Sequence, residues 1–265
     1  MKGKVWWLKM AQKVKNIAIV QKNERIGTDI YSIWLKDEQI AANAKPGQFV
    51  SVYTGEADKL LPRPISICEI DKENGLLRLV FRVVGAGTRL FAALAEGDTV
   101  EVMGPLGNGF CLEGFKKAIL IGGGIGIPPM LELAKQLDCE KQIVLGYRDE
   151  LFLNEEFEPY GRVYLSTEDG SAGTKGNVID AIRANDLDCD MILACGPTPM
   201  LRGIKAYAEE KGIRAQISME EKMACGIGAC LACVCKSREK DHHTNVNNKR
   251  ICKDGPVFYA DEVEL

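Results

Sequence analysis

Four cysteines near the C-terminus constrain this chain more than any other feature of its sequence. The first three follow the spacing C-x4-C-x2-C in a run rich in glycine and alanine, and the fourth stands alone well downstream. This is the plant-type spacing of the thiolates that hold a [2Fe–2S] cluster. Small residues between the cysteines let a tight loop wrap such a cluster and point backbone N–H groups at its sulfurs. The predicted metal ligands are Cys225, Cys230, Cys233 and Cys252.

Structural zinc is the main alternative for these thiols, because zinc also takes four thiolates. Zinc sites usually pair two short cysteine knuckles, whereas here one ligand stands alone, so the pattern favours the cluster. His242 and His243 could replace cysteines as in Rieske centres, but no C-x-H pattern supports this and we expect solvated loop histidines. Cys235 is the next candidate ligand, although on a strand leaving the loop it would point away from its neighbours.

The ten cysteines of the chain would suggest disulfides in a secreted protein. We find no export signal, and half of the cysteines cluster at one end, so metal binding in a reducing cytoplasm is the better interpretation. Residues 1–9 are interpreted either as an extension before a true start at Met10 or as a short surface arm. The remaining cysteines lie in apolar stretches and are predicted to be buried free thiols, namely Cys68, Cys111, Cys139, Cys189 and Cys195.

Charge and hydropathy argue against two classes of partner. The formal net charge of −3 gives no basic signature, so we expect no nucleic-acid partner. No apolar run approaches the roughly 20 residues needed to cross a bilayer, so we expect no membrane association. A chain of 265 residues is long enough for two domains and a small module.

The order of strand-like and helix-like segments predicts three units. Residues 13–103 are short runs of Val, Ile, Phe and Tyr separated by turn residues, which predicts a small antiparallel β-barrel with one helix at 88–94. After Gly109, strands alternate with helices as in a parallel α/β sheet. The polar tract 236–250 is expected to be an exposed loop or hairpin. The predicted fold class is therefore α+β multidomain, with an antiparallel β-barrel domain at 11–112, a parallel α/β domain at 113–217 and a small cysteine module at 218–265.

Three segments of the predicted barrel carry groups suited to a flavin nucleotide. Arg63-Pro-Ile-Ser66 offers a guanidinium fork for a pyrophosphate and a hydroxyl for the flavin ring. Val80-Phe-Arg82 lies on a neighbouring predicted strand. Gly85-Ala-Gly-Thr88 lies at the start of a predicted helix, where free N–H groups and the helix dipole favour phosphate. Taken alone, Arg63–Ser66 is weak evidence, since a strand that starts at a proline has the same pattern.

Two segments of the α/β unit point to a dinucleotide. Gly122-Gly-Gly-Ile-Gly126 follows a predicted strand and precedes a helix, which brings backbone close to a diphosphate. Pro128 and Pro129 suit the first turn of that helix, where a missing N–H costs little. Cys195-Gly-Pro197 ends another strand at the same expected sheet edge. The acidic stretch Leu165-Ser-Thr-Glu-Asp-Gly170 contains no arginine, which favours NADH over NADPH.

In their order along the chain, these segments resemble the signatures of the ferredoxin–NADP reductase family, over roughly residues 13–215. In that family a barrel binds FAD and an α/β domain binds a nicotinamide nucleotide. The resemblance implies FAD contacts at Arg63, Pro64, Ile65, Ser66, Val80, Phe81, Arg82, Gly87 and Thr88. It implies NAD(H) contacts at Gly122, Gly123, Gly124, Gly126, Cys195, Gly196 and Pro197, the last three near the nicotinamide and flavin rings.

With the cysteine module included, nearly the whole chain resembles the family of electron-transfer subunits of bacterial type B dihydroorotate dehydrogenases. The resemblance assigns a [2Fe–2S] cluster to the same four cysteines. It implies an FMN-containing catalytic subunit that oxidises dihydroorotate to orotate, in a heterotetramer with two of each subunit. Electrons would pass from FMN through the cluster and FAD to NAD⁺. The apolar cluster loop, with Ile227, Ala229 and Leu231, is expected to lie near that partner.

Two other functions stay open at this point. A small FAD and [2Fe–2S] subunit of an NADH-dependent ferredoxin–NADP oxidoreductase or sulfide dehydrogenase would share the architecture. In that group the first cluster ligand tends to be an aspartate, whereas this chain has Cys225. A non-catalytic redox sensor or zinc-binding protein would leave Arg63–Ser66 and Gly122–Gly126 without a role. No arrangement of His, Asp and Ser suggests direct catalysis on a substrate, so no catalytic residue is assigned.

Overall fold

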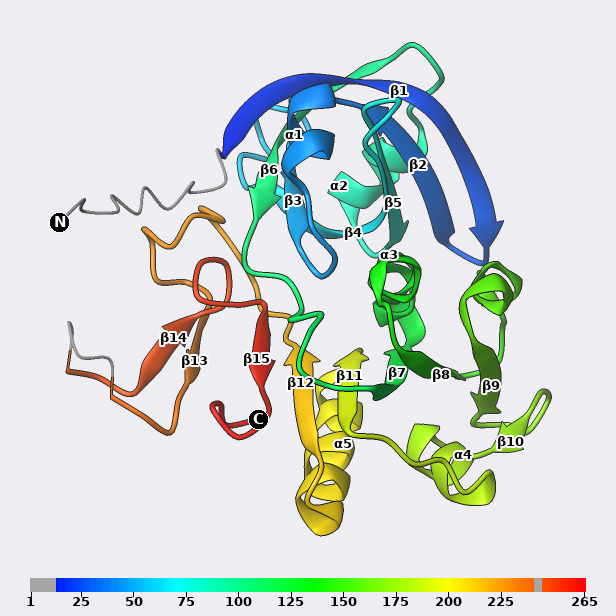
Figure 1. Cartoon of the computed structure of the whole chain (residues 1–265). Helices are drawn as coiled ribbons and strands as arrows, with labels where there is room; N and C mark the ends of the chain where they lie inside the picture. The colour runs from blue at the N-terminus through cyan, green and yellow to red at the C-terminus, as the bar shows by residue number, and fades with distance from the viewer. Residues whose placement is uncertain (1–12, 241–244) are drawn as a thin grey trace, which may run out of the picture.

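The computed structural model describes residues 13–240 and 245–265. Six antiparallel strands close the N-terminal barrel in the order β1-β2-β5-β4-β3-β6. The barrel lies over the edge of a second sheet at which β11 and β12 end (Figure 1). The barrel strands are β1 (Val14–Gly27), β2 (Ile30–Lys36), β3 (Phe49–Val52), β4 (Arg63–Asp71), β5 (Leu76–Arg82) and β6 (Thr99–Leu106).

Alternating side chains fill the interior of the barrel. Val50 and Val52 on β3 and Ile65 and Ile67 on β4 point into one buried cluster, while the residues between them face outward. Phe81 lies in the same cluster. The predicted closed barrel is thus confirmed, and the outward-facing residues of β3 and β4 are free to contact other parts of the chain.

Two helices accompany the barrel, and only one of them was predicted. Helix α2 (Ala86–Ala92) lies where the helix at 88–94 was expected. Helix α1 (Glu38–Asn43) was missed, because six residues are too few to show a helical period. Its local signal is Asp37, whose carboxylate accepts a hydrogen bond from the Ile40 backbone N–H at 2.9 Å and caps the first turn.

The second sheet has seven strands in the order β10-β9-β8-β7-β11-β12-β15, and all neighbours except β12 and β15 are parallel. This confirms the predicted parallel α/β unit. The order reverses between β7 and β11, which makes a topological switch point there. The strands are β7 (Lys117–Gly123), β8 (Glu140–Tyr147), β9 (Arg162–Thr167), β10 (Thr174–Lys175), β11 (Met191–Cys195), β12 (Arg214–Ser218) and β15 (Val257–Tyr259).

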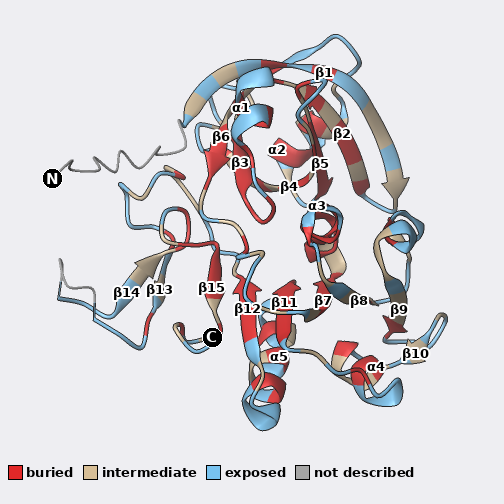
Figure 2. Ribbon diagram, in the orientation of Figure 1, coloured by how far each residue is buried: buried red, intermediate tan, exposed pale blue. Residues whose placement is uncertain are grey.

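Helices cover both faces of this sheet. Ile119 and Ile121 of β7 pack in one cluster with α4 (Val178–Ala184) and α5 (Thr198–Lys211), whereas Ala118 and Leu120 pack in another with α3 (Pro128–Gln136). The strands are accordingly buried on both sides (Figure 2). Two short 3₁₀ segments, η1 (Gly124–Gly126) and η2 (Asn154–Tyr160), complete the unit. Among the described residues, none of the helices has the length and apolar character needed to span a membrane.

The cysteine module is joined to the second sheet rather than separate from it. Its strand β15 pairs antiparallel with β12, so that Phe258 lies opposite Ile217. The rest of the module contains a hairpin of β13 (Val234–Lys236) and β14 (Asn248–Arg250), which agrees with the expected loop or hairpin. His242 and His243 lie outside the described residues.

The five cysteines outside the module are not all buried. Cys68 and Cys195 are buried and Cys139 and Cys189 are partly buried. The prediction was wrong for Cys111, which is exposed. Cys111 lies in the connection between β6 and β7, and its thiol donates to the Glu113 carbonyl at 3.6 Å.

A buried arginine joins the barrel to the α/β unit. Arg78 on β5 donates to Glu69 on β4 at 2.7 Å, to Ser32 on β2 at 2.8 Å, and to Glu156 of η2. Lys135 of α3 bonds the other oxygen of Glu69 at 2.9 Å. The Arg78 side chain is 7% exposed, so its buried positive charge needs these carboxylates as compensating partners.

Replacing Arg78 should therefore cost more stability than replacing an arginine of an exposed ion pair. We expect Arg78→Ala to lower the free energy of unfolding by roughly 3 kcal/mol, because Glu69, in a buried place, loses one of its two cationic partners and keeps only Lys135. Denaturant unfolding of the full chain measures the change. The control is Arg148→Ala, whose side chain is 79% exposed beside Asp149 and should cost less than about 0.5 kcal/mol. Equal losses in the two variants would contradict the role given to Arg78.

Candidate functional site

The first two predicted ligands share one tight loop. The Cys225 sulfur accepts hydrogen bonds from the backbone N–H groups of Ala229 at 3.3 Å and Cys230 at 3.4 Å. Gly226 and Gly228 have φ of +67° and +85°, in the left-handed region that favours glycine. Burial opposes ionisation of Cys225, but hydrogen bonds from the loop outweigh it and lower its pKa to about 6. The loop therefore stabilises a thiolate, which is the form that binds iron.

The other two predicted ligands form a second, buried pair. The Cys252 backbone N–H donates to the Cys233 sulfur at 3.4 Å, and both side chains are buried. Burial and the neighbouring Cys233 thiol raise the pKa of Cys252 to about 12.

The four predicted ligands fall into two pairs. Within the described parts of the chain, no three or more His, Cys, Asp or Glu side chains are grouped so that they could hold a metal ion. Two thiolates per iron in a [2Fe–2S] cluster match the pairs Cys225/Cys230 and Cys233/Cys252. The four residues remain predicted ligands. Cys235 lies on β13, partly buried against the neighbouring core.

The cluster loop lies on the outside of the barrel. A Cβ placed on Gly226 would lie 2.8 Å from Ser51 Oγ on β3 and 3.2 Å from Leu106 Cδ1 on β6. Phe49, the other outward-facing residue of this part of β3, shares a buried cluster with Cys233 and Cys252. The cluster loop and the barrel are therefore in direct contact along β3.

One asparagine, just after the last barrel strand β6, binds the segment that follows Cys252. The Asn108 backbone N–H donates to Gly255 at 2.6 Å, and its side chain donates to the carbonyls of Lys253 at 3.1 Å and Asp254 at 3.0 Å. Sequence reasoning missed Asn108 and Ser51, because neither lies in a recognisable motif. Only the contact between segments far apart in the chain identifies them.

The predicted flavin-binding segment lies directly beside β3. The pairing of β3 with β4 sets Ser51 opposite Pro64 and Phe49 opposite Ser66. Opposite residues on one face of an antiparallel pair have Cβ atoms about 5 Å apart. Predicted cluster ligands and predicted flavin contacts thus lie on neighbouring parts of the same barrel surface.

Arg63 and Gly87 are brought into contact, although they are far apart in the sequence. A Cβ on Gly87 would lie 2.3 Å from Arg63 Nε and 2.5 Å from Cζ, so only glycine lets the guanidinium lie against the start of α2. The guanidinium also donates to the Leu61 carbonyl. The side chain of Ser66 has no hydrogen-bond partner among the described residues and can serve a ligand. A guanidinium, a glycine cradle and a hydroxyl suit a flavin nucleotide.

The remaining predicted FAD contacts differ in what they can offer. The Thr88 hydroxyl accepts from the N–H groups of Val84 at 3.0 Å and Gly85 at 3.2 Å, so it shapes the turn. Val80 and Phe81 are buried in the two cores that flank β5. Arg82 is exposed and keeps its charge available at the surface.

The predicted NAD(H) segments meet at the switch point of the second sheet. Cys195 lies opposite Gly122 in the β11–β7 pairing, and a Cβ on Gly126 would lie 2.5 Å from the Cys195 carbonyl oxygen. Cβ atoms on Gly123 and Gly196 would each lie 2.4 Å from Met200 of α5. The lack of side chains at these glycines lets the turns after β7 and β11 pack closely. This is the place where open α/β sheets bind ligands.

Gly124 differs from the other glycines of this turn. Its φ is +52°, and a Cβ there would meet nothing within 4 Å. It is the position of this turn whose backbone faces open space. The acidic stretch after β9 follows the same edge, where Asp169 accepts from Ser171 Oγ at 2.7 Å, a bond that lowers the pKa of Asp169.

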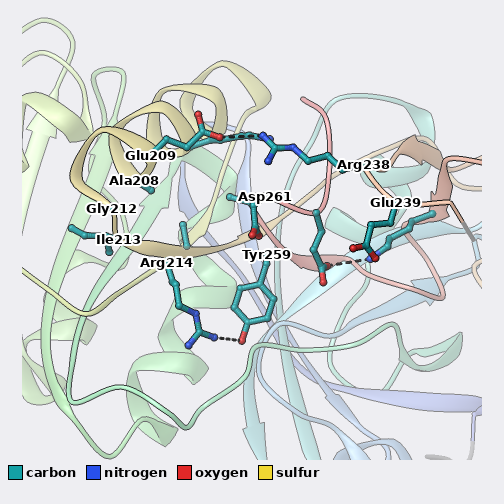
Figure 3. A pocket seen from close by; sticks show the side chains of 14 residues that line it. Ala208, Glu209, Gly212, Ile213, Arg214, Arg238, Glu239, Tyr259 and Asp261 are labelled. Atoms are coloured by element: carbon teal, nitrogen blue, oxygen red, sulfur yellow. Dashed lines mark hydrogen bonds and ion pairs between the residues drawn. The ribbon is translucent and has the colours of Figure 1, made fainter.

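One cavity among the described residues lies away from all predicted site residues. Its volume is about 700 Å³, and it lies between the end of α5, β12, β15 and the β13–β14 hairpin (Figure 3). Two of its arginines have partners, with Arg214 donating to Tyr259 Oη at 2.8 Å and Arg238 to Glu209 at 3.4 Å. It shares no residue with the predicted cofactor contacts.

Two families match this chain. Residues 17–110 match the oxidoreductase FAD-binding domain. Residues 220–264 match the iron-sulfur cluster binding domain of dihydroorotate dehydrogenase B. The matches fall within the first and third predicted units, whose boundaries remain predictions.

Curated relatives are similar over nearly their whole length. The chain is 43% identical over 259 residues to the dihydroorotate dehydrogenase B (NAD(+)), electron transfer subunit, of Fusobacterium nucleatum, covering 93% of this chain and 97% of that protein. It is 44% identical over 256 residues, with the same coverage, to the protein of that name from Listeria monocytogenes.

Solved structures support the same architecture. The NADH-dependent reduced ferredoxin-NADP oxidoreductase, studied for flavin-based electron bifurcation, has a TM-score of 0.84 at 30% identity, over 93% of this chain and 89% of that chain. The ferredoxin reductase of carbazole 1,9a-dioxygenase has a TM-score of 0.65 at 21% identity, over 76% and 67% of the two chains, and supports the fold alone.

The contact between Arg63 and Gly87 gives a sharp test of the flavin site. We expect Gly87→Ala to weaken FAD binding about tenfold or more, because the added methyl displaces a guanidinium whose hydrogen bonds to a charged group are each worth about 1.5–3 kcal/mol. The control is Gly85→Ala, where a Cβ meets nothing within 4 Å and the backbone is extended. FAD titration of flavin-stripped protein measures both variants, and equal dissociation constants would refute the assigned contact.

Proposed function

The chain belongs to the family of dihydroorotate dehydrogenase B (NAD⁺) electron transfer subunits, and we propose that it passes electrons from a dihydroorotate-oxidising catalytic subunit to NAD⁺. It is a subunit of a flavin and iron–sulfur oxidoreductase, with one domain for FAD and one for the cluster. The proposal also includes an FMN in the catalytic subunit, two copies of each subunit in the complex, and a cytoplasmic location.

The observation that carries this proposal is the position of β3. Its outer face contacts the cluster loop through Ser51 and Gly226, and its edge pairs with the Arg63–Ser66 segment of β4. A cluster and a flavin bound at these residues would be close neighbours, as electron transfer between them requires. FAD supplies two-electron hydride chemistry and the cluster supplies one-electron steps.

The residues of the chain have separate tasks in this scheme. The Arg63 guanidinium binds the anionic part of the flavin nucleotide, and the Ser66 hydroxyl donates to the flavin ring. The backbone at Gly124, where a Cβ would meet no atom within 4 Å, accepts the dinucleotide at the sheet edge. Backbone N–H groups of Ala229 and Cys230 hold the Cys225 sulfur in its anionic form.

Exposed apolar side chains of the cluster loop and of the adjoining strand β13 support docking of the catalytic subunit there. Ile227, Leu231 and Val234 are 43%, 59% and 37% exposed. Burying such side chains against a partner is favourable, at about 25 cal/mol per Å² of apolar surface. A partner bound here would lie next to the cluster.

The structural likeness to the NADH-dependent ferredoxin-NADP oxidoreductase supports a second candidate, a small subunit of such an enzyme. Residue 225 favours the first, since that group tends to carry an aspartate where this chain has a cysteine.

Reconstitution with the catalytic subunit tests the proposal. The purified chain should show flavin and iron–sulfur absorption, and the complex should reduce NAD⁺ when given dihydroorotate. Absence of these absorption bands would sink the proposal. Ferredoxin-dependent NADP⁺ reduction without a response to dihydroorotate would select the second candidate.

Two glutamate substitutions, one on the proposed docking surface and one on β1, test where the catalytic subunit binds. We expect Ile227→Glu to abolish complex formation in size-exclusion chromatography, because a charge would be buried against the partner. Ile17→Glu places the same charge on β1 of the barrel, at a side chain that is 70% exposed, and should leave assembly intact. Full assembly of Ile227→Glu would contradict the docking surface.

A further inference from the structure

Ser51 on β3 is buried but has no hydrogen-bond partner for its hydroxyl. Its side chain is 1% exposed, and Oγ is unpaired among the described residues. Leaving a buried hydroxyl unpaired costs about 1–3 kcal/mol. Such a group in a folded protein calls for an explanation, and a ligand that completes the hydrogen bond is one.

The surroundings of this hydroxyl point to the cluster loop. Val50 and Val52 face the barrel interior, so Ser51 between them faces outward. There its Oγ lies 2.8 Å from where a Cβ on Gly226 would be, next to the predicted ligand Cys225. The side chains of Met103 and Leu106 also lie within 4 Å of that Cβ position, and they are apolar.

Ser51 also borders the predicted flavin segment. It lies opposite Pro64 in the β3–β4 pairing. The hydroxyl is thus placed at the junction between the segment that holds the first two cysteines and the segment that carries Arg63–Ser66.

We propose that the Ser51 hydroxyl donates a hydrogen bond to sulfur at the Cys225 end of the bound cluster and raises its reduction potential; this rests on the proposed function. Hydrogen bonds to cluster sulfurs are one of the ways in which proteins set such potentials. The reduced cluster is the more negative form, so a donor stabilises it more than the oxidised form. Ser51 is therefore a tuning residue for electron flow between the cluster and FAD.

Redox titration of the full chain carrying FAD and cluster tests this, with EPR following the reduced cluster. At the wild-type midpoint, Ser51→Ala and Ser51→Val should lower the ratio of reduced to oxidised cluster about threefold to tenfold, because a hydrogen-bond donor is lost. Ser51→Thr keeps the hydroxyl and should stay near the wild type. A threonine that behaves like valine would overturn the proposal, since the two differ by that hydroxyl.

Ser166 provides a matched control elsewhere in the molecule. Its Oγ on β9 is also fully buried and unpaired among the described residues. Ser166→Ala should leave the cluster potential unchanged. An equal shift in Ser166→Ala and Ser51→Ala would overturn the specific role of Ser51.

Stability of the cluster-free chain separates tuning from folding. In that form Ser51→Ala should not lower the free energy of unfolding, because it removes an unpaired hydroxyl. A large loss of stability would overturn the proposal by showing that the protein itself uses the hydroxyl. A wild-type chain that binds neither flavin nor cluster would defeat the proposed function, whereas a loaded chain whose potential ignores Ser51 would defeat this inference alone.

Discussion

The outer face and the edge of one short strand, β3, bring the cysteine module next to the segment with the predicted flavin contacts. Backbone hydrogen bonds tie β3 to β4, whose first residues carry the predicted flavin contacts. Its outward side chains Phe49 and Ser51 meet the cysteine module. Because strand pairing fixes positions to within about one residue spacing, the distance between the two cofactor segments is set by the barrel itself.

Two further contacts keep the three units in fixed relation. The buried network around Arg78 joins the barrel to α3 and η2, and the Glu132 carboxylate of α3 accepts from the Ile70 backbone N–H at 2.7 Å. On the other side, Asn108 holds the segment that follows Cys252. The predicted flavin, nucleotide and cluster residues therefore belong to one framework, which suits a protein that relays electrons between bound groups.

The glycines of this chain serve different purposes that a motif does not distinguish. Gly126 and Gly196 allow two turns of the α/β sheet to pack on each other or on Met200. Gly87 makes room for the Arg63 guanidinium, and Gly124 alone in its turn faces open space. A glycine motif therefore predicts close backbone approach, but the structure decides whether the approaching group is protein or ligand.

Much of this protein was determined by local sequence. The spacing of the four cysteines predicts a tight loop, and the switch from alternating to helical patterns predicts a barrel followed by a parallel sheet, because these signals depend on nearby residues. What the sequence missed depends on contacts between distant segments. Helix α1 was too short to show a helical period in the sequence. Cys111 is exposed in the connection between β6 and β7, and β15 joins the edge of the second sheet. The pairing of Cys233 with Cys252 and the unpaired hydroxyl of Ser51 beside Gly226 were decided by tertiary structure alone, since each arises where separate parts of the chain pack together.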